Sequence, residues 1–207
     1  SVANLDNLWS NLQSHDVHHV GIRTILKGLL KLFASFFHSG LSEGKPLSLL
    51  DNEPLYQLLL KHVDIARLDN MINADQLHAL CISALGYSSG HNISFIQGHS
   101  SIKGWTSARR SGVKTTLSHN HIMASAALPA IFPSVRINRE YFGDGALRQT
   151  APLSSALNLG ADKLFVIGVS GNTSQPYERE KTIHSPSIAQ VLSQLLNSAF
   201  IDSMDED

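Results

Sequence analysis

An aspartate between two glycines is the strongest candidate for chemistry in this sequence. Asp144 stands between Gly143 and Gly145, and a helix start capped by Thr150 follows it. Glycines on either side allow tight-turn backbone conformations and a close approach to a substrate. Gly160 is expected to end this helix, and the apolar run Leu164–Val169 after it predicts a buried strand. Asp144 is therefore expected at a strand–turn–helix junction, where α/β enzymes place their chemistry.

A second segment has the letters of a nucleophile elbow. Residues Gly86–Gly90 read G-Y-S-S-G and match G-x-S-x-G. That motif activates its serine only where a strand leads in and a helix leads out, with the helix N-terminus beneath the developing oxyanion. Here the apolar run Leu80–Leu85 leads in and the alternating run Asn92–Gln97 leads out, a pattern typical of a β-hairpin. We therefore expect Ser88 on a hairpin turn.

The segments around Asp144 carry a family resemblance. The strings ASAALPAIFP and YFGDGALRQTAPLSSALNLGADKLFVIGV resemble the C-terminal half of patatin-like phospholipases, most specifically between Ile122 and Val169. That family is known for a Ser–Asp dyad whose aspartate lies in an Asp-Gly-Gly or Asp-Gly-Ala motif, matched here from Asp144 onward. The resemblance implies a lipid acyl hydrolase with Asp144 as the base. It implies no metal and no other cofactor, with Gly143 and Gly145 leaving room for the Ser–Asp contact.

The resemblance also implies parts that these residues do not contain. The family needs a Gly-rich oxyanion loop and a serine elbow upstream of the aspartate, and we expect both before Ser1. The expected fold class is α/β, a three-layer α/β/α patatin-like sandwich. Residues 1–207 would then be a partial domain without the N-terminal part of the sheet. On this expectation the chain alone is inactive, and the parent protein cleaves acyl-ester bonds in phospholipids or other lipid esters.

Two other functions stay open at this point. The parent protein could be a catalytically inactive patatin-like scaffold that binds lipid or a protein partner, and an elbow without its serine would distinguish it. Alternatively, the chain could be a hydrolase outside this family that pairs Ser88 with His91 or His121. The predicted hairpin argues against the second alternative.

Basic residues near Trp105 are candidates for substrate binding. Lys103, Arg109, Arg110 and Lys114 lie in a polar stretch whose simplest interpretation is a solvated loop. The functional alternative is that Arg109 and Arg110 hold a phosphate-bearing lipid head group, because guanidinium groups match phosphate geometry.

A long amphipathic helix is expected near the N-terminus. Apolar residues recur at spacings of three and four over Val17–His38, and Leu26 and Leu30 belong to this apolar face. The helix either packs on a sheet or docks on lipid as a peripheral membrane contact through Phe33 and Phe36. Shorter helices are expected at Leu5–Leu12, after Asp51 or Asn52, and over His121–Pro129.

Composition excludes several functional classes. The chain has 207 residues, 43% of them hydrophobic and 16% charged, which is typical of one globular domain. A net charge of −1 argues against nucleic acid as a partner. One cysteine, Cys81, cannot form a disulfide framework and is compatible with a reducing compartment. His15, His18 and His19 lack carboxylate or thiolate partners at a recognisable ligand spacing, so no metal site is predicted.

Overall fold

The computed structural model of the chain describes residues 2–17, 26, 28, 30, 48–145 and 153–167. The chain divides into two compact units, Ser1–Gly145 and Ala146–Asp207. The first unit contains the strands and most of the described helices, and the second contains the helix α7, Leu153–Asn158.

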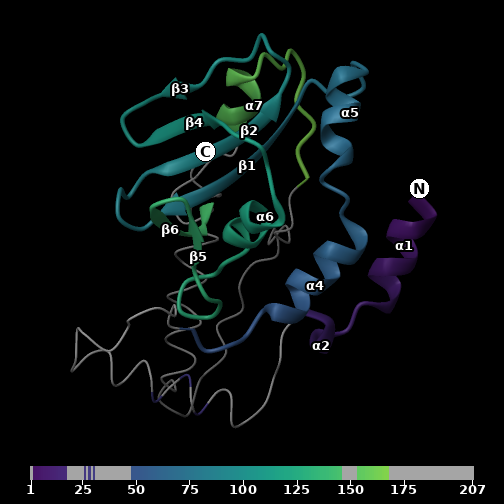
Figure 1. Cartoon of the computed structure of the whole chain (residues 1–207), viewed down its shortest axis with the longest axis vertical. Coiled ribbons are helices and arrows are strands. Elements are labelled where there is room, and N and C mark those ends of the chain that lie inside the picture. Colours follow the sequence, from purple (N-terminus) through teal and green to yellow (C-terminus); the bar gives the residue numbers. More distant parts are fainter. Residues whose placement is uncertain are drawn as a thin grey trace, which may run out of the picture. The chain divides into compact units, whose positions relative to one another are not determined.

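A mixed six-stranded sheet organises the first unit, with the strand order β3-β4-β2-β1-β6-β5 (Figure 1). Among the described strands, β2 and β4 alone pair in parallel, and the other neighbouring strands are antiparallel. The strands are β1 Ala79–Gly86, β2 Asn92–Gly98, β3 Trp105–Thr106, β4 Arg110–Lys114, β5 Val135–Ile137 and β6 Glu140–Asp144. The expected α/β class is confirmed by this sheet and its helices.

The helices of the first unit whose ends the structure describes are mostly short. They are α1 Val2–Asn11, α2 Ser14–Val17, α4 Glu53–His62, α5 Arg67–Asn73 and α6 His119–Ser125. The start of α4 follows its sequence signals, because Asn52 is the N-cap and Pro54 lies in the first turn. The carboxylate of Asp51 also accepts the free N–H of Glu53 at 3.1 Å. The predicted helix after Asp51 or Asn52 is thus confirmed.

One face of the sheet forms the core. Directly paired residues on neighbouring strands put their side chains on the same face. The rings of Phe95 on β2 and Phe142 on β6 meet edge-to-face at 5.2 Å between centroids. Helices α5 and α6 add apolar side chains to this face, and the buried cluster consists of Leu68, Ile72, Ala84, Phe95, Leu117, Ala124, Ile137 and Phe142.

Two sequence predictions about strands have opposite outcomes in this sheet. The hairpin is confirmed, because β1 and β2 pair antiparallel from Ala79 with Gly98 to Leu85 with Asn92. The loop predicted around Trp105 is wrong in part, because Trp105–Thr106 and Arg110–Lys114 form β3 and β4. The basic side chains of this stretch are exposed, as expected. The Trp105 ring fills the space where a side chain on Gly112 would lie, and this close approach holds the two strands together.

The second unit confirms one prediction and corrects another. Helix α7 ends where Gly160 takes a φ of +89°, and the Gly160 and Ala161 N–H groups bond back to Leu157 and Ala156, as in a Schellman motif. The predicted buried strand is wrong for Leu164–Ile167, which is irregular, with Phe165 91% exposed. An apolar run becomes a buried strand only when another strand pairs with it, and none of the described strands does.

The long N-terminal helix is described at only three positions. Residues 26, 28 and 30 are helical, as expected, but Leu26 and Leu30 are 64% and 73% exposed. This exposure argues against the first alternative for this helix, in which Leu26 and Leu30 pack on a sheet. The buried side of the helix carries Gly28, where a β-carbon would lie 2.9 Å from the carbonyl oxygen of Ser48. Phe33 and Phe36 lie outside the described residues. Among the helices that are described, none is long and apolar enough to span a bilayer.

Candidate active site

Asp144 lies at the end of a strand, as the sequence predicts. It is the last residue of β6 and pairs with Ala84 of β1. Its side chain is half-buried, on the sheet face that forms the core. The backbone N–H of Asp144 donates to the carbonyl of Ala127, just beyond α6, at 2.9 Å. This bond ties the strand end to the helix. Residues 146–152, where the expected turn and helix start fall, lie outside the described residues.

Gly145 packs against the backbone of β1. A β-carbon at this position would lie 2.7 Å from the carbonyl oxygen of Ser83. Its own carbonyl accepts a hydrogen bond of 2.9 Å from the side-chain amide of Asn92, which is 3% exposed. Asn92 belongs to β2, which lies on the far side of β1 from β6. The residue after Asp144 is therefore held by two strands, and Gly145 is required there for close approach.

Gly143 is covered by an aromatic side chain. The hydroxyl and ring of Tyr87 occupy the space that a β-carbon on Gly143 would fill. Burial raises the pKa of Tyr87, and the negative charge of Asp144 raises it further. Neither Gly143 nor Gly145 has a positive φ. Among the glycines in the described part of the chain, only Gly90 and Gly160 have one. The two glycines beside Asp144 thus serve packing against β1 and Tyr87.

The G-x-S-x-G match is part of a hairpin turn. Gly86 ends β1, and the turn closes with the Gly90 N–H donating to the Gly86 carbonyl at 2.9 Å. The carboxylate of Glu140 on β6 accepts the Ser89 N–H at 2.6 Å, which anchors the turn. Strand β2 follows the turn, so Ser88 has no helix N-terminus behind it. The sequence prediction of a hairpin rather than an elbow is confirmed at this segment.

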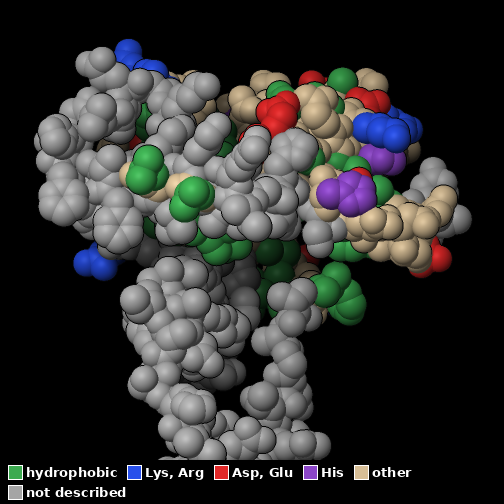
Figure 2. Space-filling view, turned by 90° about the horizontal axis from the view of Figure 1, so that it is seen from below, with side chains coloured by type: hydrophobic (Ala, Val, Ile, Leu, Met, Phe, Trp, Pro, Cys, Tyr) green, Lys and Arg blue, Asp and Glu red, His purple; other side chains and the backbone are tan. Residues whose placement is uncertain are grey.

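The structure does not bring Arg109 and Arg110 next to Asp144. Arg110 begins β4 and lies opposite Asn92 on β2. Asn92 lies opposite Leu85 on β1, which in turn lies opposite Gly143 on β6. Arg110 and Gly143 are therefore three strand spacings, or about 14 Å, apart. This register puts Arg110 on the opposite sheet face from Asp144. Both arginines are exposed at the same end of the sheet as Asp144. Figure 2 shows basic and acidic side chains scattered over the described part of one face of the molecule.

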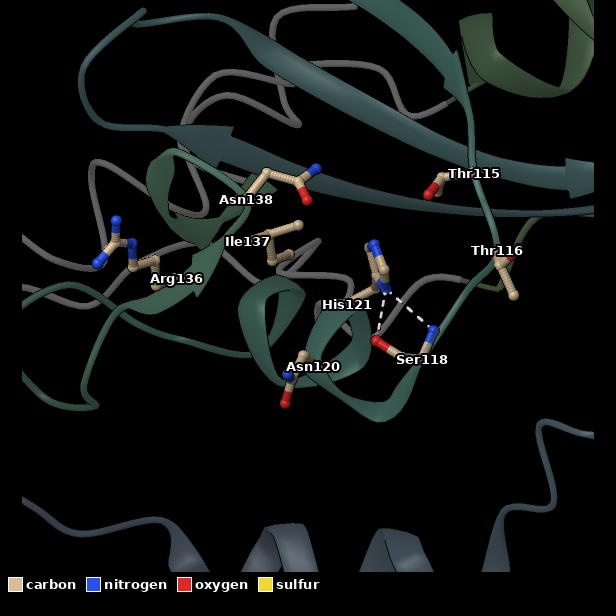
Figure 3. Close-up of a pocket in the computed structure, with 8 residues that line it drawn as sticks. All are labelled: Thr115, Thr116, Ser118, Asn120, His121, Arg136, Ile137 and Asn138. Atoms are coloured by element: carbon tan, nitrogen blue, oxygen red, sulfur yellow. Dashed lines mark hydrogen bonds between the residues drawn. The ribbon is translucent and has the colours of Figure 1, made fainter.

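His121 is buried against the core of the sheet. Its Nδ1 accepts the Ser118 N–H at 3.0 Å in a capping box at the start of α6. Its ring, 5% exposed, packs on Phe95 with 4.7 Å between centroids. Burial lowers the pKa of His121. The ring also lines a polar pocket with Thr115 and Asn138 (Figure 3).

Sequence reasoning missed Tyr87, Asn92 and Ala127 as neighbours of the Asp144 segment. One signal was available for Asn92, an amide-bearing residue at the start of the predicted strand. Nothing in the sequence marks Tyr87 or the carbonyl of Ala127, because both depend on how β1, β6 and α6 meet. Within the described ranges, no group of three or more His, Cys, Asp or Glu side chains is placed to hold a metal ion.

Comparison with known proteins identifies the family. The family model described as patatin-like phospholipase matches residues 5–157, which is more than half of the chain. No curated protein and no solved structure matches the chain. The matched range includes the hairpin of β1 and β2, helix α6 and Asp144. The chain therefore belongs to the patatin-like phospholipase family, whose members are lipid acyl hydrolases.

Proposed function

We propose that this chain carries Asp144 as the general base of a Ser–Asp dyad in a lipid acyl hydrolase. The main support is the half-buried Asp144 carboxylate at the end of β6, in a segment tied to Ala127 and Asn92. A base held between rigid elements keeps its position as a substrate enters. The family's Asp-Gly-Ala pattern at this strand end further supports the proposal.

The chemistry needs one carboxylate to act twice. As the serine oxygen attacks the acyl carbon, the hydroxyl proton passes to Asp144, and backbone donors stabilise the oxyanion. The protonated Asp144 then gives this proton to the leaving alcohol, and an acyl-enzyme forms. Water attacks the acyl-enzyme next, Asp144 takes a proton from it and returns one to the serine oxygen, and a fatty acid leaves. A free aspartate, with a pKa of about 3.9, is a weak base, so position rather than basicity must supply the effect.

The serine of the dyad is proposed to lie in a segment outside residues 1–207. Two stretches of the sequence match G-x-S-x-G. Gly86–Gly90 is a hairpin turn, which cannot act as an elbow, and Gly40–Gly44 follows the predicted helix Val17–His38 instead of a strand. The oxyanion loop would come from the same outside segment. The chain alone is then expected to be inactive.

The test compares residues 1–207 with a longer protein that includes the sequence before Ser1 in the native gene. Hydrolysis of a p-nitrophenyl acyl ester is the readout. We expect activity only in the longer protein, and Asp144→Asn should lower kcat by about 10²–10⁴-fold. Asp64→Asn, an exposed aspartate in the α4–α5 connection, is the matched control and should leave kcat unchanged.

Three other outcomes of this experiment would each contradict a different part of the proposal. Strong activity of residues 1–207 that Ser88→Ala removes would overturn the outside-serine proposal. A folded longer protein that lacks both the elbow serine and activity would favour the inactive, lipid- or protein-binding scaffold. An active longer protein that is insensitive to Asp144→Asn would remove Asp144 from the mechanism.

The substrate class has a separate test. We propose that Arg109 and Arg110 attract phosphate-bearing head groups at the rim of this sheet end. The double change Arg109→Gln and Arg110→Gln should raise KM for phospholipids about three- to ten-fold and leave KM for uncharged esters unchanged. Equal effects on both substrates would contradict this role.

A further inference from the structure

A polar pocket of about 260 Å³ lies between the start of α6 and the turn from β5 to β6 (Figure 3). Ile137 lines it with one apolar side chain and Arg136 with one charged side chain. Pockets for drug-sized ligands have volumes of roughly 300–1,000 Å³, so this one fits a smaller ligand. The rest of its lining consists of uncharged side chains that form hydrogen bonds, namely Thr115, Thr116, Ser118, Asn120, His121 and Asn138.

His121 presents a hydrogen-bond donor to this pocket. Its ring is 5% exposed, and the Ser118 N–H donates to Nδ1 at 3.0 Å. Burial lowers the pKa of His121, so at neutral pH the ring is uncharged and carries its proton on Nε2. Figure 3 shows Nε2 directed between the side chains of Asn138 and Thr115. It has no hydrogen-bond partner among the described residues, and a ligand in the pocket would supply one.

The charges around the pocket favour a neutral ligand over an ion. Among the described residues that line it there is no aspartate or glutamate, so no carboxylate is available to a cation. In Figure 3 the guanidinium group of Arg136 points outward, away from His121 and Thr115. An ion without a counter-charge costs far more to bury than a hydroxyl that forms hydrogen bonds. Hydroxyl groups also both donate and accept, which matches the mixed donors and acceptors of this lining.

We propose that this pocket binds a neutral polyhydroxylated compound of monosaccharide size. One oxygen of the ligand accepts the His121 Nε2–H, and neighbouring hydroxyls bond to Thr115 and Asn138. Ile137 supplies an apolar surface for the carbon–hydrogen face of the ligand. Asp144 does not line the pocket, so the ligand has no part in the proposed ester hydrolysis.

Titration of the 207-residue chain with glucose, galactose and mannose, followed by NMR, tests the proposal. We expect the ring signals of His121 to shift saturably with at least one of these sugars. The ring signals of His78, which is exposed and lies outside the pocket lining, should stay in place. The uronic acid and the 2-amino form of the same sugar add a negative or a positive charge to the same ring. Neither should bind more tightly than the neutral sugar.

Matched variants locate the bound sugar. Thr115→Val removes one hydroxyl at nearly constant shape and should weaken binding about five-fold. Asn138→Gly removes the amide and keeps a residue that tolerates the φ of +55° at this position, and should weaken binding about five- to ten-fold. Two control variants should leave binding within about two-fold. They are Thr106→Val, on β3 and outside the pocket lining, and Arg136→Gln.

Three results would overturn the proposal. If none of the three sugars shifts the His121 signals saturably, the pocket holds water alone. If the uronic acid binds more tightly and Arg136→Gln removes this preference, the pocket is an anion site. If neither Thr115→Val nor Asn138→Gly weakens binding, the sugar binds elsewhere. Because the readout is binding, it is independent of whether Asp144 acts in catalysis.

Discussion

The side chain of Tyr87 lies where a β-carbon on Gly143 would be, and the negative charge of Asp144 disfavours ionisation of the Tyr87 hydroxyl. Tyr87 directly follows β1, while Gly143 and Asp144 end β6. The Tyr87 N–H also donates to the Tyr141 carbonyl at 3.0 Å, which extends the pairing of the two strands. A tyrosine from the hairpin turn therefore covers the strand end that carries the proposed base.

The two glycines beside Asp144 should differ in their tolerance of alanine. Gly145→Ala meets the backbone of Ser83, which cannot move, and should lower the free energy of unfolding by about 2–3 kcal/mol. Gly143→Ala meets the half-exposed ring of Tyr87, which can swing away, and should cost less than about 1 kcal/mol. Urea unfolding of both variants checks this order. Equal costs would mean that Tyr87 is held as rigidly as the β1 backbone.

The titration of Tyr87 should report the charge of Asp144. Burial and this charge both raise the pKa of Tyr87, so Asp144→Asn should lower it without returning it fully to about 10. A raised pKa in the folded state stabilises the fold below the unfolded pKa, and this stability is lost as pH rises through the folded value. Tyr87→Phe should therefore reduce the loss of stability above about pH 10. Carbon NMR of the tyrosine rings measures the shift, with Asp64→Asn as control.

Asn92 should position the segment after Asp144. Asn92→Ala leaves the Gly145 carbonyl without this buried donor and should lower the free energy of unfolding by about 1–3 kcal/mol. Asn11→Ala removes a comparable amide–carbonyl bond of 2.8 Å on the exposed surface of α1, and should cost less than about 0.5 kcal/mol. Urea unfolding compares the two. In the longer protein, Asn92→Ala should lower kcat more than it raises KM; a change in KM alone would argue against a positioning role.

His121 should make the fold sensitive to acid. Burial lowers the pKa of His121, so below about pH 6.5 the unfolded chain binds a proton more readily than the folded one, and stability falls as pH falls. His121→Gln keeps a side chain that can complete the capping box with Ser118 and removes the titration. The variant should lose less stability than the parent between neutral and mildly acidic pH in thermal unfolding. The exposed His78→Gln is the control and should behave like the parent.

Local pattern predicted several parts of this fold correctly. The alternation in Asn92–Gln97 and the turn residues before it predicted a hairpin, because strand pairing between neighbours in sequence depends mainly on local signals. The cap and proline at the start of α4 and Gly160 after α7 marked helix ends for the same reason. Local pattern failed for Leu164–Ile167 and for the stretch around Trp105, where pairing with distant strands decides the outcome.

Residue types at short spacing were enough to predict the family, the α/β class and the strand end at Asp144. The surroundings of Asp144 depend on packing between distant parts of the chain. Tyr87, Asn92 and Ala127 meet its segment from a turn, a strand and a helix end that are far apart in the sequence. Tertiary structure likewise joined Thr115, His121 and Asn138 into one pocket. Such contacts arise from how elements pack across the sheet, and local residue spacing carries no record of that packing.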